Sequence, residues 1–364
     1  MGLDQGNAQF GVFSGKRVLI TGHTGFKGAW LTAWLQHLGA EVTGVGLDPV
    51  TEPSLHTVMA LGSSIRDIRQ DIRDFDALMK IVEETRPDFV FHLAAQAIVS
   101  RSFTDPLYTF ETNVVGSINL LESIRQAGKP TQVVMVTSDK AYSNQEWVWG
   151  YRESDRLGGH DPYSGSKAAA EVGIASYVDS FFGSNSGIRI GIARAGNVIG
   201  GGDWSADRIV PDAVRSWRSA KQLVVRNSRS TRPWQHVLEP LSGYLTLASR
   251  LASDPAIGGE AFNFGPEIPE GRSVADLVMR LERGLPGLTW TDRTEPHDLK
   301  EAGLLQLNCE KARSLLGWRS VLSFDDTVDI TCDWYSRFFA DEASALRITR
   351  DQIERYTDLR SQAG

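Results

Sequence analysis

Short apolar runs alternate with amphipathic stretches along residues 16–196. The runs are rich in Val and Ile, which predicts β-strands, and the stretches between them repeat apolar residues at helical spacing. Strands that alternate with helices form βαβ units, and such units build a parallel sheet covered on both faces. The expected strands are 17–21, 41–47, 88–93, 132–137 and 188–193, and the expected helices are 25–38, 74–84, 104–127 and 162–182.

The pattern loosens after about residue 200, where Gly, Pro and Trp become frequent. We therefore expect an α/β protein with a Rossmann-like, doubly wound parallel sheet and a smaller, mostly C-terminal substrate-binding lobe. The expected divisions are an N-terminal extension at 1–15, the Rossmann-like domain that contains the sheet at 16–196, the lobe mainly at 197–340 with chain returning to the sheet domain at about 238–257, and a polar helix or tail at 341–364.

Composition narrows the class of protein. The chain has 364 residues, 41% of them hydrophobic, and a net charge of -7, so it is expected to be globular and has no basic stripe for nucleic acid. No apolar run reaches the roughly 20 residues of a membrane-spanning helix, and the first residues show no signal-peptide pattern. The seven histidines lack metal-ligand spacing, and Cys309 and Cys332 are expected to be reduced thiols. We expect a cytoplasmic protein without a metal.

The segment after the first expected strand has the glycine spacing of a dinucleotide-binding turn. Gly22, Gly25 and Gly28 allow a tight turn, close approach to a pyrophosphate and helix packing. The helix N-terminus that follows offers free N–H groups to phosphates. Asp48 ends the second strand, 20 residues after Gly28, where a carboxylate binds an adenosine ribose. An ordinary turn role before Pro49 is the alternative for Asp48.

Two further segments fit a dinucleotide site. Asp71 and Ile72 lie between the expected strands 41–47 and 88–93, where they would flank the adenine, although a solvated loop aspartate explains Asp71 nearly as well. Because no Lys or Arg lies between Lys27 and Arg66, no nearby cation in the sequence would bind a 2′-phosphate, and NAD is favoured over NADP. The expected strand at 88–93 ends in residues that permit close approach of a cofactor: Leu93, Ala94, Ala95 and Gln96.

A tyrosine and a lysine on one expected helix form a candidate proton-transfer pair. Tyr163 and Lys167 lie one turn apart and share a face. A nearby ammonium lowers the pKa of a phenol from its usual value near 10. A helix surface pair is the alternative when this spacing is taken alone. A surface pair does not explain why the glycine turn, Asp48 and this pair occur together in this order. Polar residues also follow the strand at 132–137, at the edge of the sheet that binds ligands: Ser138, Asp139 and Lys140.

These residues resemble the extended short-chain dehydrogenase/reductase superfamily and, within it, the CDP-glucose 4,6-dehydratase family. The superfamily resemblance rests on the glycine turn, on residues 93–96 (LAAQ), on the Tyr163–Lys167 pair and on the length. The narrower resemblance spans residues 16 to about 335 and rests on four stretches: 22–28 (GHTGFKG), 137–142 (TSDKAY), 146–153 (EWVWGYRE) and 231–240 (TRPWQHVLEP).

The resemblance implies a hydro-lyase with tightly bound NAD that converts CDP-glucose to CDP-4-keto-6-deoxyglucose, a step of deoxysugar biosynthesis for lipopolysaccharide O-antigen. It implies that Tyr163 takes the 4-hydroxyl proton with support from Lys167, and that Ser138 hydrogen-bonds the 4-oxygen. It also implies that Asp139 is the acid of the elimination. Lys140 replaces a Glu of the related dTDP-glucose enzymes, so the C5 base is open, and a buried lysine could serve.

The resemblance also implies the binding residues. Asn197 and Arg232 would bind the nucleotide diphosphate, with Arg208 assisting. Lys300 stands where the family has His, so neither it nor His297 is assigned to the site. The long helices imply a homodimer, possibly a tetramer. The implied cofactor contacts are Gly22, Thr24, Gly25, Phe26, Lys27, Gly28, Asp48, Asp71, Ile72, Leu93, Ala94, Ala95, Gln96, Thr112, Tyr163 and Lys167.

Two other functions stay open at this point. The first is another nucleotide-sugar 4,6-dehydratase or a 4-epimerase on the same fold. An epimerase needs no acid and base for elimination, so Asp139 and Lys140 count against it. The second is a non-catalytic NAD-binding regulatory protein, against which the intact Ser138, Tyr163 and Lys167 count. In each case we expect a small-molecule partner rather than nucleic acid or a membrane.

Overall fold

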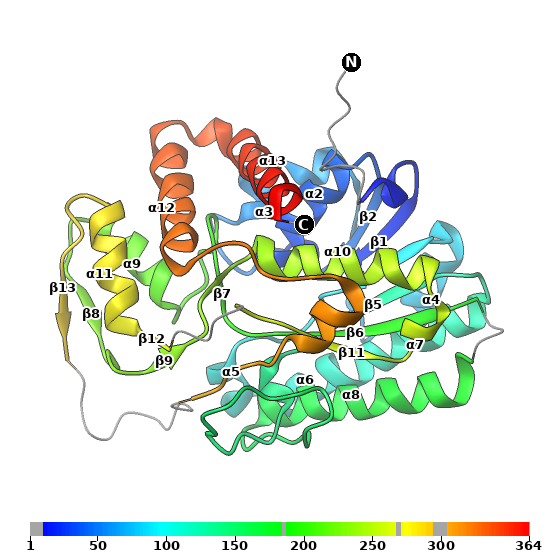
Figure 1. The fold of residues 1–364 in the computed structure, drawn as a ribbon. Helices are drawn as coiled ribbons and strands as arrows, with labels where there is room; N and C mark the ends of the chain where they lie inside the picture. The colour runs from blue at the N-terminus through cyan, green and yellow to red at the C-terminus, as the bar shows by residue number, and fades with distance from the viewer. Residues whose placement is uncertain (1–9, 184–186, 267–270, 294–303, 364) are drawn as a thin grey trace.

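The computed structural model describes residues 10–183, 187–266, 271–293 and 304–363. Within them, seven strands form one parallel sheet in the order β11-β6-β5-β4-β1-β2-β3 (Figure 1). Since β2 and β4 lie on opposite sides of β1, the sheet is doubly wound, and the expected Rossmann-like fold is confirmed. The strands are β1 (Arg17–Thr21), β2 (Glu41–Gly46), β3 (Arg66–Arg69), β4 (Phe89–His92), β5 (Gln132–Val136), β6 (Arg189–Ala195) and β11 (Ala261–Phe264).

Helices cover both faces of the sheet (Figure 1). Alternate residues of β1 belong to two separate cores, Val18 and Ile20 to one and Leu19 to the other, as the period of two in a strand requires. The first core is shared with α2 (Phe26–His37) and α10 (Leu238–Ser253). The second is shared with α4 (Phe75–Thr85), α7 (Gly116–Ala127) and α8 (Pro162–Phe181).

The expected helix at 104–127 is confirmed from Pro106 to Ala127, where the helical segments follow one another without a break. The chain forms α5 (Val99–Thr104), α6 (Pro106–Phe110), a π-helical segment (Glu111–Val115) and then α7. Pro106 has no N–H with which to continue α5, and Asp105 caps α6 by accepting a hydrogen bond from the Tyr108 N–H. The π-helical turn is the kind of distortion that recurs at functional sites, and it carries Thr112.

Two strands were not among those that the sequence pattern predicts. The strand β3 reads Arg-Asp-Ile-Arg at the edge of the sheet, so its charged residues conceal it. The strand β11 has only four residues and forms the opposite edge. The chain therefore returns to the sheet not only over the expected 238–257 but again at β11.

The smaller lobe continues from the carboxyl end of β6. It contains three short strand pairs and the helices α9 (Ile209–Arg218) and α11 (Val274–Gly284). The pairs are β7 (Val198–Ile199) with β10 (Gln235–His236), β8 (Leu223–Val225) with β13 (Trp290–Asp292), and β9 (Thr231–Arg232) with β12 (Arg272–Ser273).

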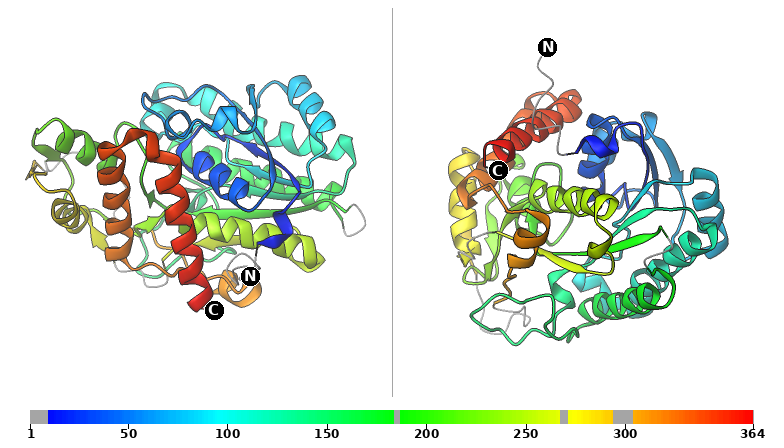
Figure 2. Two further views of the ribbon diagram at one scale, coloured as in Figure 1. Left: turned by 90° about the horizontal axis from the view of Figure 1, so that it is seen from above. Right: turned by 45° about the vertical axis from the view of Figure 1, so that its right-hand side comes forward.

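Segments near both ends of the chain belong to the core rather than to free extensions. Phe10 and Phe13, within the expected extension 1–15, are almost completely buried. The expected polar tail forms α13 (Ala345–Ala363), which buries Ile353 and Tyr356, packs on α2 and lies beside α12 (Phe324–Ala340) (Figure 2). Among the helices that the structure describes, none is long and apolar enough to cross a membrane.

Candidate active site

The glycine turn between β1 and α2 is shaped by close backbone contacts. Gly22 has φ +78°, and a Cβ there would lie 2.6 Å from the backbone nitrogen of Ala94, at the end of β4. A Cβ on Gly28 would lie 2.1 Å from the carbonyl oxygen of Gly22. Gly25 precedes α2 and donates its N–H to that same oxygen. Larger residues could not form this turn, whose following helix N-terminus has N–H groups available for a phosphate.

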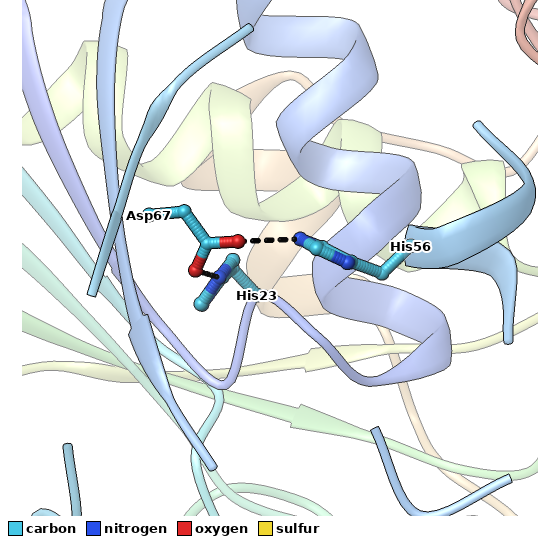
Figure 3. A group of neighbouring side chains, drawn as sticks. All are labelled: His23, His56 and Asp67. Carbon is cyan, nitrogen blue, oxygen red and sulfur yellow. Dashed lines mark hydrogen bonds and ion pairs between the residues drawn. The ribbon is translucent and has the colours of Figure 1, made fainter. Parts of the chain in front are cut away.

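His23, inside the glycine turn, belongs to a buried cluster with His56 and Asp67 (Figure 3). Its Nε2 lies 2.8 Å from Asp67 Oδ1, and His56 Nε2 lies 3.2 Å from Asp67 Oδ2. A Cβ on Gly44 would lie 2.4 Å from the His23 ring, so the glycine in β2 makes room for this ring. His23 therefore links the glycine turn to β3, which carries Asp67. The prediction of a protein without a metal used only spacing along the chain and remains untested.

Asp48 extends from the end of β2 into solvent, as a ribose-binding carboxylate must. The structure corrects one premise about its surroundings, however. Arg69, at the end of β3, places its Nε 3.4 Å from Asp48 Oδ1 and donates from Nη2 to Asp67 at 2.9 Å. A cation therefore stands beside Asp48 although none lies near it in the sequence. Two carboxylates contact this guanidinium, so the local charge stays negative.

The expected adenine-flanking residues have their own partners. The Asp71 carboxylate accepts hydrogen bonds from the Arg73 side chain at 2.8 and 3.0 Å. Ile72 is buried and packs over Gly116, where a Cβ would lie 2.5 Å from its Cδ1. Their contact with an adenine remains a prediction.

The end of β4 is held in place by an asparagine that the sequence did not reveal. Asn113, in the π-helical segment, accepts a hydrogen bond from the Gln96 N–H at 2.8 Å and donates one to Ser166 at 2.8 Å. It thus links the Leu93–Gln96 segment to α8. The neighbouring Thr112 hydroxyl is buried and has no hydrogen-bond partner in the described part of the chain. A buried hydroxyl in this state fits a polar ligand group at the expected cofactor site.

The polar turn after β5 is enclosed. Ser138 and Asp139 are 7% and 5% exposed, and Ser138 Oγ donates to Asp139 Oδ1 at 3.1 Å. Burial raises the pKa of Asp139, against the opposing effect of Lys140 and Ser138, which favours a protonated side chain that can act as an acid. A Cβ on Gly196 would lie 2.9 Å from Asp139 Oδ2, so this glycine leaves room for the carboxyl. Lys140 itself is only half-buried, so the expectation of a buried lysine is wrong.

Tyr163 and Lys167 occupy the first turns of α8, which Asp161 caps. Burial raises the pKa of Tyr163 to about 12, and a hydrogen bond with Ser138 lowers it. Burial lowers the pKa of Lys167 to about 8, and the carboxylate of Glu171 opposes that shift. The hydrogen bond between Tyr163 and Ser138 therefore brings the candidate base beside the buried turn that carries the candidate acid.

Lys27, in the first turn of α2, lies near Asp139 and Lys167. Its Nζ donates to the Tyr244 hydroxyl at 3.4 Å, and burial lowers its pKa to about 8, helped by Arg208 and opposed by Asp139. Tyr244 of α10 was not predicted as a site residue. No motif marks it, because only the packing of α10 against the sheet brings it here.

The three expected substrate residues lie on the lobe side of the site. Arg208 directly precedes α9 and pairs with the buried Asp203 at 3.1 Å. Asn197 follows Gly196 directly, two residues beyond the end of β6. Arg232 in β9 precedes Pro233, whose ring is 3.5 Å from the Cβ position of Gly196. Their contact with a nucleotide remains a prediction, and Lys300 and His297 lie outside the described residues.

Comparison with known proteins agrees with this geometry. The family model described as GDP-mannose 4,6 dehydratase matches residues 19–331. The chain belongs to this family. A CDP-glucose 4,6-dehydratase of Salmonella typhimurium is 43% identical over 342 residues, which cover 91% of this chain and 93% of that protein. The chain therefore spans nearly the full length of an enzyme of the expected kind.

Solved structures share the fold of this family member. An epimerase from Methanothermobacter thermautotrophicus has a TM-score of 0.77 and 24% identity, with 94% of this chain and 98% of that chain covered. A dTDP-glucose 4,6-dehydratase from Streptomyces venezuelae, solved with NAD and TYD bound, has a TM-score of 0.73 and 24% identity, with 88% and 97% covered. At these identities the likeness concerns the fold.

Proposed function

We propose that this protein is an NAD-dependent hydro-lyase that converts CDP-glucose to CDP-4-keto-6-deoxyglucose and water. The observation that carries the proposal is that the buried side chains of Asp139 and Tyr163 lie next to each other. An oxidation coupled to an elimination needs both a proton acceptor and a proton donor at this place. The specific substrate is supported by the 43% identity to a protein named CDP-glucose 4,6-dehydratase.

The residues around the glycine turn fit NAD. The lack of side chains at Gly22 and Gly28 supports binding of a pyrophosphate there, and the exposed Asp48 carboxylate supports binding of a ribose. The Thr112 hydroxyl, which has no hydrogen-bond partner among the described residues, supports a contact with a polar group of the cofactor. When bound, NAD would supply the hydride acceptor for oxidation at C4 and the hydride donor for reduction at C6. Asp48 and Asp67 surround Arg69 with negative charge, which disfavours an additional 2′-phosphate.

In the first step, Tyr163 accepts the proton of the sugar 4-hydroxyl as the alcohol becomes a ketone. Its pKa of about 12 must fall for this role, and the ammonium of Lys167 one turn away stabilises the phenolate. Ser138, which already hydrogen-bonds Tyr163, orients the 4-oxygen. The 4-ketone makes the C5 proton acidic, which prepares the elimination.

In the second step, the C5 proton and the 6-hydroxyl leave together as the C5–C6 double bond forms. Asp139 donates its proton to the departing hydroxyl, which leaves as water. Lys140 accepts the C5 proton and gives it back to C5 when the hydride is returned to C6, so the sugar undergoes no net oxidation. We assign the nucleotide diphosphate to Asn197, Arg208 and Arg232, since guanidinium groups match phosphate oxygens.

A 4-epimerase is the second candidate, because the family fold is shared with epimerases. An epimerase would use Tyr163 and Lys167 but would leave the acid Asp139 without a role. Burial raises the pKa of Asp139, which suits an acid and therefore favours the dehydratase.

We propose that the enzyme acts as a homodimer in the cytoplasm, where nucleotide sugars and NAD are available. Exposed apolar side chains gather on the helices expected at the dimer interface: Phe103, Leu107, Phe110, Val115 and Val172. A second copy that covers them would remove this apolar surface from water. Light scattering at micromolar concentration should give twice the chain mass; a monomer would contradict the dimer but not the reaction.

The reaction is tested by mixing the purified protein with CDP-glucose and NAD and following the product by mass spectrometry. The expected product is lighter than the substrate by one water, absorbs after alkali treatment as a 4-keto sugar does, and forms without steady NADH accumulation. CDP-galactose without loss of water would instead identify an epimerase. NADH that rises in step with product would identify a net dehydrogenase.

A further inference from the structure

A buried ion pair lies directly behind the catalytic turn. Glu171 of α8 is 2% exposed and Arg194 of β6 is 4% exposed. Arg194 Nε donates to both oxygens of Glu171 at 2.9 Å, and its Nη2 forms an ion pair with the same carboxylate. Taking both charges out of water costs several kcal/mol per ion in general, so stability alone is a weak reason for such a pair.

The pair contacts both ends of the turn that carries Ser138 and Asp139. At the start of the turn, Thr137 Oγ1 donates to Glu171 Oε1 at 2.6 Å. At its end, Arg194 Nη1 donates to the Tyr142 hydroxyl at 2.7 Å, and the guanidinium lies 4.7 Å from the centre of the Tyr142 ring. One ion pair therefore fastens residues 137 and 142 to the helix that carries the catalytic tyrosine and lysine.

The far end of the turn is anchored a second time. The Tyr142 hydroxyl donates to Asn263 Oδ1 at 2.8 Å, and Asn263 Nδ2 donates to the Tyr151 carbonyl at 2.9 Å. The Arg194 guanidinium thus stands at the centre of a network that joins α8, β6, β11 and the catalytic turn. All the side chains at its centre are buried, so water cannot replace a lost contact without rearrangement.

Glu171 also lies one helical turn beyond Lys167. The other titratable or charged groups that face Lys167 are Tyr163 on α8, His92 from β4 and Lys27 from α2, whereas Arg194 faces Glu171. The Glu171 carboxylate acts on Lys167 against the effect of burial, so it favours the charged ammonium.

We propose that Glu171 and Arg194 are positioning residues of the dehydration: they fix the Ser138–Asp139 turn against Tyr163 and Lys167. Neither residue touches the substrate. The proposal rests on the proposed function, because it assumes that Asp139 and Tyr163 act on one sugar. It assigns to this pair the alignment of the proton donor with the proton acceptor.

The main test is Glu171→Gln, which keeps the shape of the side chain and removes its charge. Mixed with CDP-glucose and NAD, this variant should form NADH 10- to 100-fold more slowly, and the alkaline limb of that rate should move to a pH about 1 lower, because Lys167 loses its proton more readily. In hydrogen–deuterium exchange, the amides of residues 138–142 should exchange faster than in the wild type. That readout does not depend on activity.

Glu239→Gln is the matched control. Glu239 of α10 is 1% exposed and accepts hydrogen bonds from the N–H groups of Val321 and Leu322 and from the Tyr356 hydroxyl, away from the catalytic turn. This variant should lose thermal stability but keep the wild-type pH profile and the wild-type exchange at 138–142. If Glu171→Gln and Glu239→Gln show the same pH dependence of NADH formation and the same amide exchange at 138–142, the proposal is overturned.

Thr137→Val provides a second variant if Glu171→Gln does not fold. It removes one contact with the turn and leaves the Glu171 charge in place. We expect faster exchange at 138–142 and slower elimination with an unshifted pH profile. Unchanged exchange would overturn the positioning role. A wild-type protein that forms no NADH with CDP-glucose would instead contradict the proposed function, so the two failures are distinguishable.

Discussion

Replacing Asp139 by Asn should separate the two halves of the reaction. The amide keeps the size of the side chain but cannot donate a proton to the departing 6-hydroxyl. General acids typically contribute about 10²- to 10⁴-fold to a rate. Because Asp139 is 5% exposed, solvent has little access to act as a substitute acid, so we expect the upper half of that range. Loss of water should therefore slow about 10³- to 10⁴-fold, whereas oxidation at C4 should continue.

The assay is rapid mixing of the variant with CDP-glucose and NAD. Absorbance at 340 nm should rise at close to the wild-type rate and then persist, because the 4-keto sugar forms and does not lose water. Tyr163→Phe is the paired variant: it lacks the group that accepts the 4-hydroxyl proton and should show almost no absorbance. If Asp139→Asn loses the absorbance as completely as Tyr163→Phe does, the division of roles between the two residues is wrong.

Two further predictions concern Lys140 and the buried histidines. Lys140→Met should retain NADH formation but lose the exchange of solvent deuterium into C5 of the sugar. Lys27→Met, measured at saturating NAD, should retain that exchange. If Lys27→Met loses the exchange and Lys140→Met retains it, Lys27 is the base. Burial lowers the pKa of His92 to about 3, so its neutral ring is retained in the folded state while the unfolded state gains a proton below about pH 6.5. Stability is therefore lost as the pH falls, by about 2 kcal/mol at pH 5. Urea unfolding at pH 7.5 and 5.0 should show that His92→Gln removes about that much of the difference, and equal pH dependence in both proteins would contradict the assignment.

The sequence predicted the features that depend on local pattern. Apolar runs located five strands of the sheet to within one or two residues, and the glycine spacing located the turn whose backbone the structure shows in contact with Ala94. The edge strands β3 and β11 were not predicted because one is charged and the other is short. The expected helix at 104–127 begins at Pro106, whose fixed φ suits the first helical position, and it contains a π-helical turn for which the apolar spacing gave no signal.

Contacts between distant residues could not be predicted in this way. Arg69 reaches Asp48 because β3 lies beside β2, and Glu171 meets Arg194 because α8 packs beneath β6. Asp139 was recognised from its neighbours in the chain, but its burial beside Gly196 follows from the tertiary fold. The half-buried state of Lys140 likewise depends on packing, and the sequence offered no signal for it.

The central claim is that a single site oxidises C4, removes water and returns the same hydride to C6. The most direct test is to supply CDP-glucose with deuterium at C4, in unlabelled water and with unlabelled NAD, and to locate the label in the product by NMR. We expect one deuterium at C6 of CDP-4-keto-6-deoxyglucose and none in free NADH. Deuterium that is recovered in free NADH, or that returns to C4 of a sugar with no loss of water, would contradict it.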